Sequence, residues 1–442
     1  MKKIIGFTCI MLLFWGTFFF NNNIALADED PINEDDLFSG ETVVEENEVV
    51  KDDVAKELDE KRIAVTGEVS TSTNFTPYDY TYDWFAAGTE NQYKLVNQIT
   101  ADFFCDIRLK GGIKSFLNVG VSYYPVGIET GFMEINSDIS IKEFFIDTNW
   151  QNKVYFRTGK QVLKWGRSYF WNPTDLINVE RKDFMNMDKS REGTYGIKVH
   201  IPSGAAKNAY FFIGMDNADQ INGVSLAGKY EFLIGGTEMS LSGWLKENYN
   251  PVYGFDISSR LFDLDLRGEI SLSAGDNAFT MDYDTLQLYK REGWVPRVSV
   301  GFTKYFDLGE EKNRISITGE FYYNYAGYEK NIFQKIQQAA DPAAERDKFM
   351  SYVYEPYVNS KYYLAIFSSV SKFIIANATL NFNAMVNLVD SSAVLTTGIS
   401  YHPTITDICI DFGLNGYLGD KYTEATIYGS RANAYFRTSI SF

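Results

Sequence analysis

Residues 434–442 read Ala434-Tyr-Phe-Arg-Thr-Ser-Ile-Ser-Phe442 and alternate by face along their whole length. One face carries Ala434, Phe436, Thr438, Ile440 and Phe442, and the other carries Tyr435, Arg437, Ser439 and Ser441. Successive side chains of a β-strand point to opposite faces, so this stretch predicts an amphipathic strand. Chain termini usually fray, so a patterned strand at the terminus is expected to pair with another strand. The partner that we expect is the strand beginning at Ile63.

The same period of two recurs from Ile63 onward, which predicts a chain built mainly of strands. Apolar faces with this spacing include Leu117, Val119, Val121 and Tyr123; Tyr195, Ile197, Val199 and Ile201; Leu264, Leu266, Gly268, Ile270 and Leu272; and Leu380, Phe382, Ala384, Val386 and Leu388. Charged residues recur on the opposite face of most of these strands. A soluble β-sandwich buries its inner faces, so this charge pattern argues against that fold.

The links between the predicted strands are mostly short and long in turn. Short links include Gly111-Gly112, Gln151-Asn152, Gly235-Gly236, Phe262-Asp263 and Ser371-Lys372. Longer links include residues 74–91, 125–137, 163–192, 275–292, 326–359 and 418–430, and the fifth of these contains a helix-compatible run at residues 331–340. Strands counted between these links number about 18, with 16 as the alternative. With an even number of antiparallel strands, the first strand begins and the last strand ends on the same side, which is the side of the short turns.

The composition of the chain and the length of its apolar runs indicate whether it could span a membrane with helices or with strands. No segment after residue 27 approaches the roughly 18 consecutive apolar residues that a membrane helix needs. Aromatic residues make up 16% of the chain, with 30 tyrosines and 34 phenylalanines. Lipid offers no water to unpaired backbone groups, so strands that span it must close into a barrel. The predicted fold class of residues 62–442 is therefore all-β, a transmembrane antiparallel β-barrel.

The N-terminal part has two different compositions. Lys2 and Lys3 precede an apolar run from Ile4 to Phe20, and Ala25-Leu26-Ala27 is a small-x-small cleavage site. Residues 1–27 therefore predict a secretory signal peptide, and a retained anchor is the alternative.

Residues 28–61 contain fifteen acidic and three basic residues, a net charge of −12. So acidic a segment cannot bury a core, which predicts a disordered leader. An acidic peptide that docks in the pore mouth or on a periplasmic partner is the competing interpretation.

The segment from Tyr155 to Asp175 combines a strand with the start of a long link. It contains Arg157-x-Gly159-Lys160-Gln161, then Trp165-Gly166, then Asn172-Pro173-x-Asp175. This pattern resembles one found in porin-like outer-membrane β-barrels, including the alginate-export type. The closing strand that ends at Phe442 is similar to the last strand of bacterial outer-membrane barrels, which the barrel-insertion machinery reads in that family. The resemblance implies an outer-membrane location, with residues 28–61 in the periplasm.

In those relatives the long link after this strand folds toward the pore. Here residues 163–192 mix cations with aromatic side chains, including Arg167, Arg181 and Lys182. Cations beside aromatic rings would suit anionic or sugar-like solutes. We expect the link to fold inward and narrow the lumen; an ordinary surface loop is the alternative. The predicted constriction comprises Arg157, Gln161, Arg167, Arg181 and Lys182, facing Arg267, Glu269 and Arg297 on the opposite wall.

Other chemistries find little support in the sequence. The only histidines are His200 and His402, and neither belongs to a recognisable catalytic motif. Cys105 and Cys409 have opposite strand parities, which argues against a disulfide. We therefore expect no enzyme, no cofactor, no metal site and no nucleic-acid partner.

The predicted function is a porin-like channel for small hydrophilic solutes, in contact with outer-membrane lipid, and a homo-oligomer is left open. The alternative is a structural or adhesive surface barrel with a blocked lumen.

Overall fold

The computed structural model describes residues 63–442 apart from residues 85–91, 110–111, 126–136, 179–180, 186, 188–189, 205, 217–219, 221–222, 310 and 404–406. The predicted signal peptide (residues 1–27) and acidic leader (residues 28–61) lie outside the described residues, so both stay predictions. No helix among the described residues is long and apolar enough to cross a membrane.

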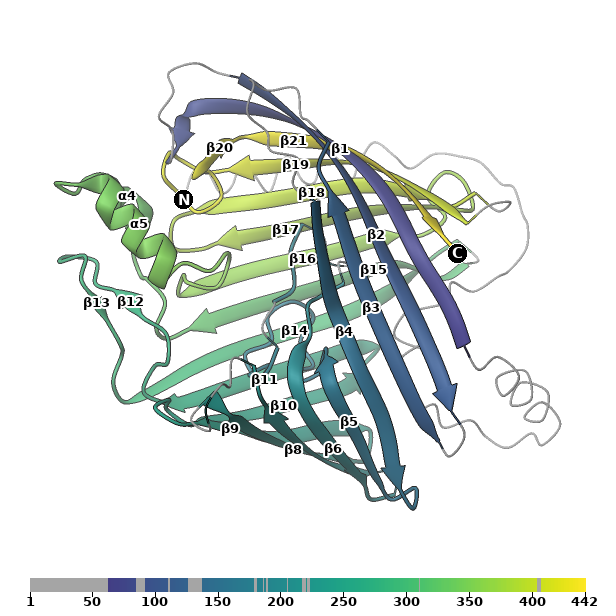
Figure 1. The fold of residues 1–442 in the computed structure, drawn as a ribbon. Coiled ribbons are helices and arrows are strands. Elements are labelled where there is room, and N and C mark those ends of the chain that lie inside the picture. The colour runs from purple at the N-terminus through teal and green to yellow at the C-terminus, as the bar shows by residue number, and fades with distance from the viewer. Residues whose placement is uncertain are drawn as a thin grey trace. The chain divides into compact units, whose positions relative to one another are not determined.

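One large antiparallel sheet contains most of the described chain (Figure 1). Its first strands are β1 (Ile63–Asp83), β2 (Gln92–Leu109), β3 (Ile113–Tyr123), β4 (Ser137–Trp150), β5 (Val154–Gln161), β6 (Thr194–Pro202), β7 (Lys207–Gly214), β8 (Ser225–Ile234), β9 (Thr237–Lys246), β10 (Val252–Leu261) and β11 (Leu264–Ala274). The others are β14 (Trp294–Leu308), β15 (Glu311–Asn324), β16 (Tyr362–Val370), β17 (Ala378–Asn387), β18 (Ser392–Tyr401), β19 (Ile408–Leu418), β20 (Tyr428–Ser430) and β21 (Ala432–Ser441).

The sheet closes on itself. Each strand pairs with its neighbours, and β21 pairs with β1 from Glu68 opposite Ser441 to Phe75 opposite Ala434. Short β20 continues this pairing along β1, so β20 and β21 together complete one strand of the ring. The protein is thus an all-β, closed antiparallel barrel of 18 strands, which confirms the predicted class, the number of about 18 and the partner of the last strand.

Phe442 makes the last contact of this closure. Its N–H donates to the carbonyl of Gly67, and the N–H of Gly67 donates to its carbonyl, both at 2.9 Å. A Cβ atom on Gly67 would lie 2.7 Å from the Phe442 ring, so the ring needs a glycine beneath it. The ring of Phe103 on β2 lies 6.2 Å from that of Phe442, on the outer face.

The barrel is apolar outside and polar inside. Outward side chains such as Ile139 and Leu241 are 72% and 55% exposed, whereas inward Asp256 and Ser299 are fully buried. A soluble protein shows the reverse distribution. An apolar outer band with a polar interior is the arrangement of a barrel surrounded by lipid.

The longer links carry additional structure at one end of the barrel (Figure 1). A separate hairpin, β12 (Thr280–Met281) with β13 (Leu288–Tyr289), lies between β11 and β14. Two helices, α4 (Ile332–Gln337) and α5 (Pro342–Tyr352), lie between β15 and β16. Helix α4 confirms the predicted helical run, and the Asn331 side chain caps it by accepting the N–H of Gln334. The first long link is shorter than predicted, because β1 continues to Asp83.

Candidate functional site

The link between β5 and β6 leaves the barrel wall at a tightly packed junction. Gly159 has a φ of 129°, and a Cβ there would lie 2.2 Å from the carbonyl oxygen of Phe144. Gln161 ends β5 with a fully buried side chain whose Nε2 donates to the carbonyls of Arg157, Gly159 and Gly196 at 3.3–3.4 Å. These bonds secure the position from which the link enters the lumen.

Glu269 on β11 is the first of two carboxylates that hold the link inside the barrel. Its neighbour Ile270 points outward, so Glu269 faces the lumen. It accepts the N–H groups of Arg167, Ser168 and Thr174, the hydroxyl of Thr174 at 2.7 Å and the amide of Asn172 at 3.0 Å. Bonds to a charged acceptor stabilise by about 1.5–3 kcal/mol each, so the link is firmly seated on β11.

Glu320 on β15 is the second carboxylate. It accepts three successive backbone N–H groups, from Tyr169 at 2.8 Å, Phe170 at 3.0 Å and Trp171 at 2.6 Å. Ser299 on β14 adds a hydroxyl at 3.1 Å. Glu269 and Glu320 are only 2% exposed, because the link covers them. The described residues of the 163–192 link therefore lie against the lumen wall, in the inward position that the sequence predicts.

Arg167 fixes the same link to a third part of the wall. Its Nε lies 2.6 Å from Asp256 on β10, and its other nitrogens pair with Glu238 on β9 and Glu231 on β8. Lys229 joins this network at 2.9 Å from Glu231 and 3.6 Å from Asp256. Asp256 is fully buried, so the fixed positive charge of Arg167 compensates a carboxylate that water cannot reach.

Aromatic packing completes the seat of the link. Trp171 stacks on Tyr322 of β15, with ring centres 5.4 Å apart and planes 10° apart. Phe184 packs against Phe367 of β16, with ring centres 5.6 Å apart. These rings belong to one buried apolar cluster that also includes Tyr363 and Met385 of the wall. Ring pairs of this kind add about 0.5–1.5 kcal/mol beyond the area they bury.

The structure gives the predicted constriction residues different surroundings. Gln161 and Glu269 are buried, which corrects the prediction that they face a solute. Arg157 forms a two-bond pair with Asp147 at 2.7 and 2.9 Å, Arg181 pairs with Glu355 at 3.0 Å, and Lys182 donates to the carbonyls of Ser168 and Tyr169. Most cations of the link are thus engaged in ion pairs or backbone contacts, and do not form the free basic surface that we expected.

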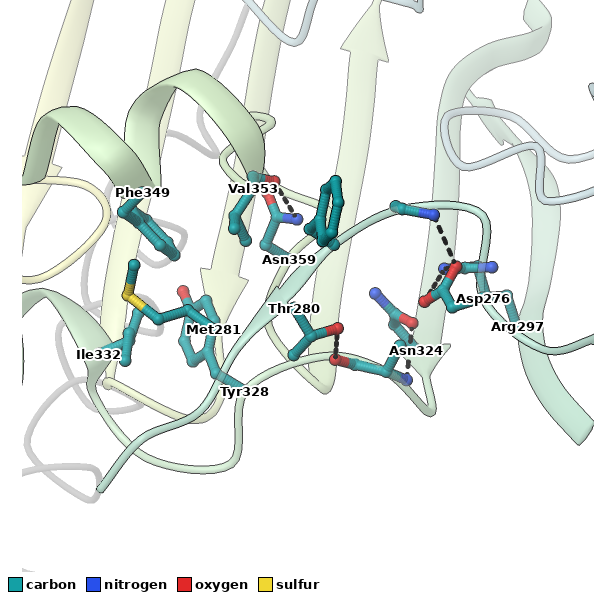
Figure 2. A pocket seen from close by; sticks show the side chains of 13 residues that line it. Asp276, Thr280, Met281, Arg297, Asn324, Tyr328, Ile332, Phe349, Val353 and Asn359 are labelled. Atoms are coloured by element: carbon teal, nitrogen blue, oxygen red, sulfur yellow. Dashed lines mark hydrogen bonds and ion pairs between the residues drawn. The ribbon is translucent and has the colours of Figure 1, made fainter. Parts of the chain in front are cut away.

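Arg267 and Arg297 differ from each other although both were placed on the opposite wall. Arg267 projects from β11 two residues before Glu269, is partly exposed, and has no ion pair with any residue that the structure describes. Arg297 instead binds both oxygens of Asp276 at 2.9 Å, beside a cavity of about 30 Å³ (Figure 2). That cavity holds about one water molecule, so it is too small to be a solute passage.

Apart from Glu269, which was expected in the constriction, sequence reasoning gave no role to the carboxylates that seat the link. Asp256, Glu231 and Glu320 have lumen parity in the sequence, and Glu238 shares it. The sequence did contain one signal for these contacts: acidic residues recur at lumen positions of neighbouring strands, and the link that folds inward is rich in cations. Which carboxylate meets which cation depends on the path of the link, and no spacing in the sequence encodes that path.

The closed antiparallel barrel of 18 strands resembles outer-membrane porins, and solved structures of that kind share its fold. Pseudomonas aeruginosa OccK7 (OpdD) is similar with a TM-score of 0.51 and 9% identity, covering 86% of this chain and 98% of that chain. A BenF-like porin from Pseudomonas fluorescens Pf-5 gives 0.51 and 8%, covering 86% and 99%. Pseudomonas aeruginosa OccK2 (OpdF), solved in complex with glucuronate, gives 0.50 and 8%, covering 86% and 98%. At these identities the likeness concerns the fold alone. Neither a protein family nor a curated protein matches the sequence.

Proposed function

We propose that this protein is a channel of the bacterial outer membrane that passes small hydrophilic solutes down their gradient. The observation that carries the proposal is the seating of residues 167–174 on the lumen wall through Glu269, Glu320 and Arg167. An inward link that crosses a wide barrel narrows the passage without closing the sheet.

The solute class follows from which charges remain available. Arg267 is partly exposed and has no ion pair with any residue that the structure describes. Arg181 is paired with Glu355 although its side chain is 60% exposed, and the other cations of the predicted constriction are engaged. A passage with few uncompensated charges suits small polar solutes and gives a modest ion preference. Kinship with alginate-export barrels rests on the motif at residues 155–175 alone, and a polyanionic solute would need more free cations than these.

Location and assembly complete the proposal. We place the barrel in the outer membrane with residues 28–61 in the periplasm, and we assign Phe442 to recognition by the barrel-insertion machinery. The pairing of Phe442 with Gly67 supports this assignment, because the terminal residue takes part in closing the sheet.

The alternative is a surface barrel with a blocked lumen, and one observation favours it. Trp171, Phe184, Val358 and Ala425 come from three different links and share one buried cluster, so apolar side chains occupy part of the interior. Liposome swelling with sugars of increasing size separates the two functions. A channel gives swelling rates that fall with solute size, whereas a blocked barrel gives no swelling with any sugar.

A further inference from the structure

Tyr155, on the lumen face of β5, has a ring that stays 40% exposed inside the barrel. Strand parity places it on the same inward face as Arg157 and Gln161. Tyr155 is next to the short link between β4 and β5, whereas the inward link leaves β5 at the other end of the strand, after Gln161. The ring therefore lies on the short-link side of the junction from which the inward link departs.

Two further rings hold Tyr155 from one side. His200 on β6 is opposite Tyr155 in the strand register, with ring centres 5.8 Å apart. Tyr210 on β7 stacks on His200 in turn, with ring centres 4.5 Å apart and planes 11° apart. The Tyr155 hydroxyl donates to the carbonyl of Asn152 in the β4–β5 turn at 3.3 Å. These contacts occupy the β6 side of the ring, so its exposed surface is on the lumen and β4 sides.

Polar side chains of β4 and β5 lie beside that exposed surface. Asn149 is the register neighbour of Tyr155 on β4, and its Oδ1 accepts the N–H of Asn152 at 3.2 Å. The Nδ2 of Asn149 has no hydrogen bond with any residue that the structure describes. The next lumen-facing pair is Asp147 with Arg157, joined by two bonds of 2.7 and 2.9 Å, and these side chains are 27% and 28% exposed. An aromatic surface therefore has an amide donor and a hydrogen-bonding ion pair next to it.

Little net charge acts on a solute in this part of the lumen. Asp147 and Arg157 compensate each other, and Lys198 on β6 has its Nζ 5.9 Å from the centre of the Tyr210 ring, whose π electrons attract it. Strand β16 is nine strands from β5 around the ring of 18, so it lies on the opposite wall. Every residue of β16, β17 and β18 is described by the structure, and none is charged. Ring contact and hydrogen bonding therefore select the solute here more than charge does.

We propose that Tyr155, Asn149 and the Asp147–Arg157 pair form a saccharide-binding subsite on the short-link side of the inward link. The C–H groups on the face of a pyranose ring pack on an aromatic ring, and its hydroxyl groups need donors and acceptors close by. Tyr155 supplies the first kind of contact, and the Asn149 amide and the partly exposed ion pair supply the second. As the solute class of the passage, this inference rests on the proposed channel function, whereas the binding itself is a property of the wall.

Saturation-transfer NMR on the full-length protein, in a detergent without a sugar headgroup, measures binding without using conduction. Maltose is the probe, and sorbitol, a polyol without a ring, is the control ligand. Maltose should receive saturation from the protein, and sorbitol should not. Tyr155→Leu should raise the Kd for maltose about fivefold, because one ring contact is lost, whereas Tyr155→Phe should keep the wild-type value. Tyr230→Leu, at an outward position that is 43% exposed, is the matched control.

Two outcomes of this experiment would overturn the subsite. One is an unchanged Kd in Tyr155→Leu, and the other is equal saturation of sorbitol and maltose. A second variant keeps the test decisive if Tyr155→Leu fails to fold. Asn149→Leu removes the amide donor and leaves the ring in place, so the Kd for maltose should again rise; an unchanged value contradicts the assignment.

Bilayer recordings then connect the subsite with transport. Maltose should reduce the current through the wild type, and a higher concentration should be needed in Tyr155→Leu. Maltose binding without any conductance would support the subsite and refute the channel. Conductance without maltose binding would refute the subsite alone.

Discussion

Arg167 forms ion pairs with three carboxylates of the barrel wall, so its replacement should change both the stability of the inward link and the width of the passage. Arg167→Met keeps the length of the side chain but leaves buried Asp256 with one cation, Lys229. Removing one partner of a buried ion pair costs about 3–5 kcal/mol. We expect residues 163–192 to become sensitive to protease in the folded protein and the conductance to rise. Lys330→Met, at an exposed position of the β15–β16 link, is the control. Equal protease resistance in wild type and Arg167→Met would contradict the seating role.

Arg267 is the residue at which charge should govern ion preference. Arg267→Glu replaces a partly exposed lumen cation by an anion, so the reversal potential in a salt gradient should shift toward cation preference. The same reversal at exposed Lys330, which lies in the β15–β16 link and not on a strand of the wall, should shift it far less. Matching shifts for the two variants would mean that Arg267 does not face the permeating ions.

The side of each strand residue could be predicted from the sequence, whereas its partner could not. Strand parity is a local property, so Arg157, Arg267 and Glu269 were correctly placed on inward faces. Whether such a residue is exposed depends on the inward link, which covers Glu269 and leaves Arg267 partly open. That covering joins residues about a hundred positions apart, and a single sequence carries no signal for it.

The link of residues 163–192 is attached as an element through two carboxylates on different strands. Glu269→Gln with Glu320→Gln places amide donors opposite the backbone N–H groups of Ser168 and Trp171. An unsatisfied buried group costs about 1–3 kcal/mol, so the link should detach while the barrel stays folded. Limited proteolysis would show early cleavage within residues 163–192. The exposed control Glu292→Gln should be cut as slowly as the wild type.

The closing pair of strands offers a test of assembly. Phe442→Ala removes the ring packed on Gly67, whereas Phe436→Ala removes an outward ring from the middle of β21. If the terminal position is read during insertion, Phe442→Ala should lower the yield of heat-modifiable barrel in cells more than Phe436→Ala does. An equal loss in the two variants would reduce Phe442 to an ordinary lipid-facing residue.

The strands could be predicted as elements because apolar residues alternate with polar residues within each segment. Pairing of β21 with β1 followed from the requirement that a membrane sheet has no free edge. Helix α5 and the β12–β13 hairpin were not predicted. Their residues pack on Phe333 and Tyr328 of the β15–β16 link, in a cluster formed by links far apart in sequence. Such links take their structure from their neighbours more than from their own pattern.

At the scale of the whole molecule, the closed sheet separates an apolar exterior from a polar interior, and the inward link decides how much of that interior stays open. Three links meet near Trp171, Tyr357 and Ala425, and this is where an open passage and a blocked one would differ.

Single-channel recording of the purified full-length protein in planar bilayers tests the central claim most directly. The account predicts discrete conductance steps, with larger steps for Arg167→Met than for the wild type, because releasing the inward link widens the passage. Absence of steps from protein that is folded, heat-modifiable and inserted in the bilayer would contradict the channel and leave the blocked barrel as the function.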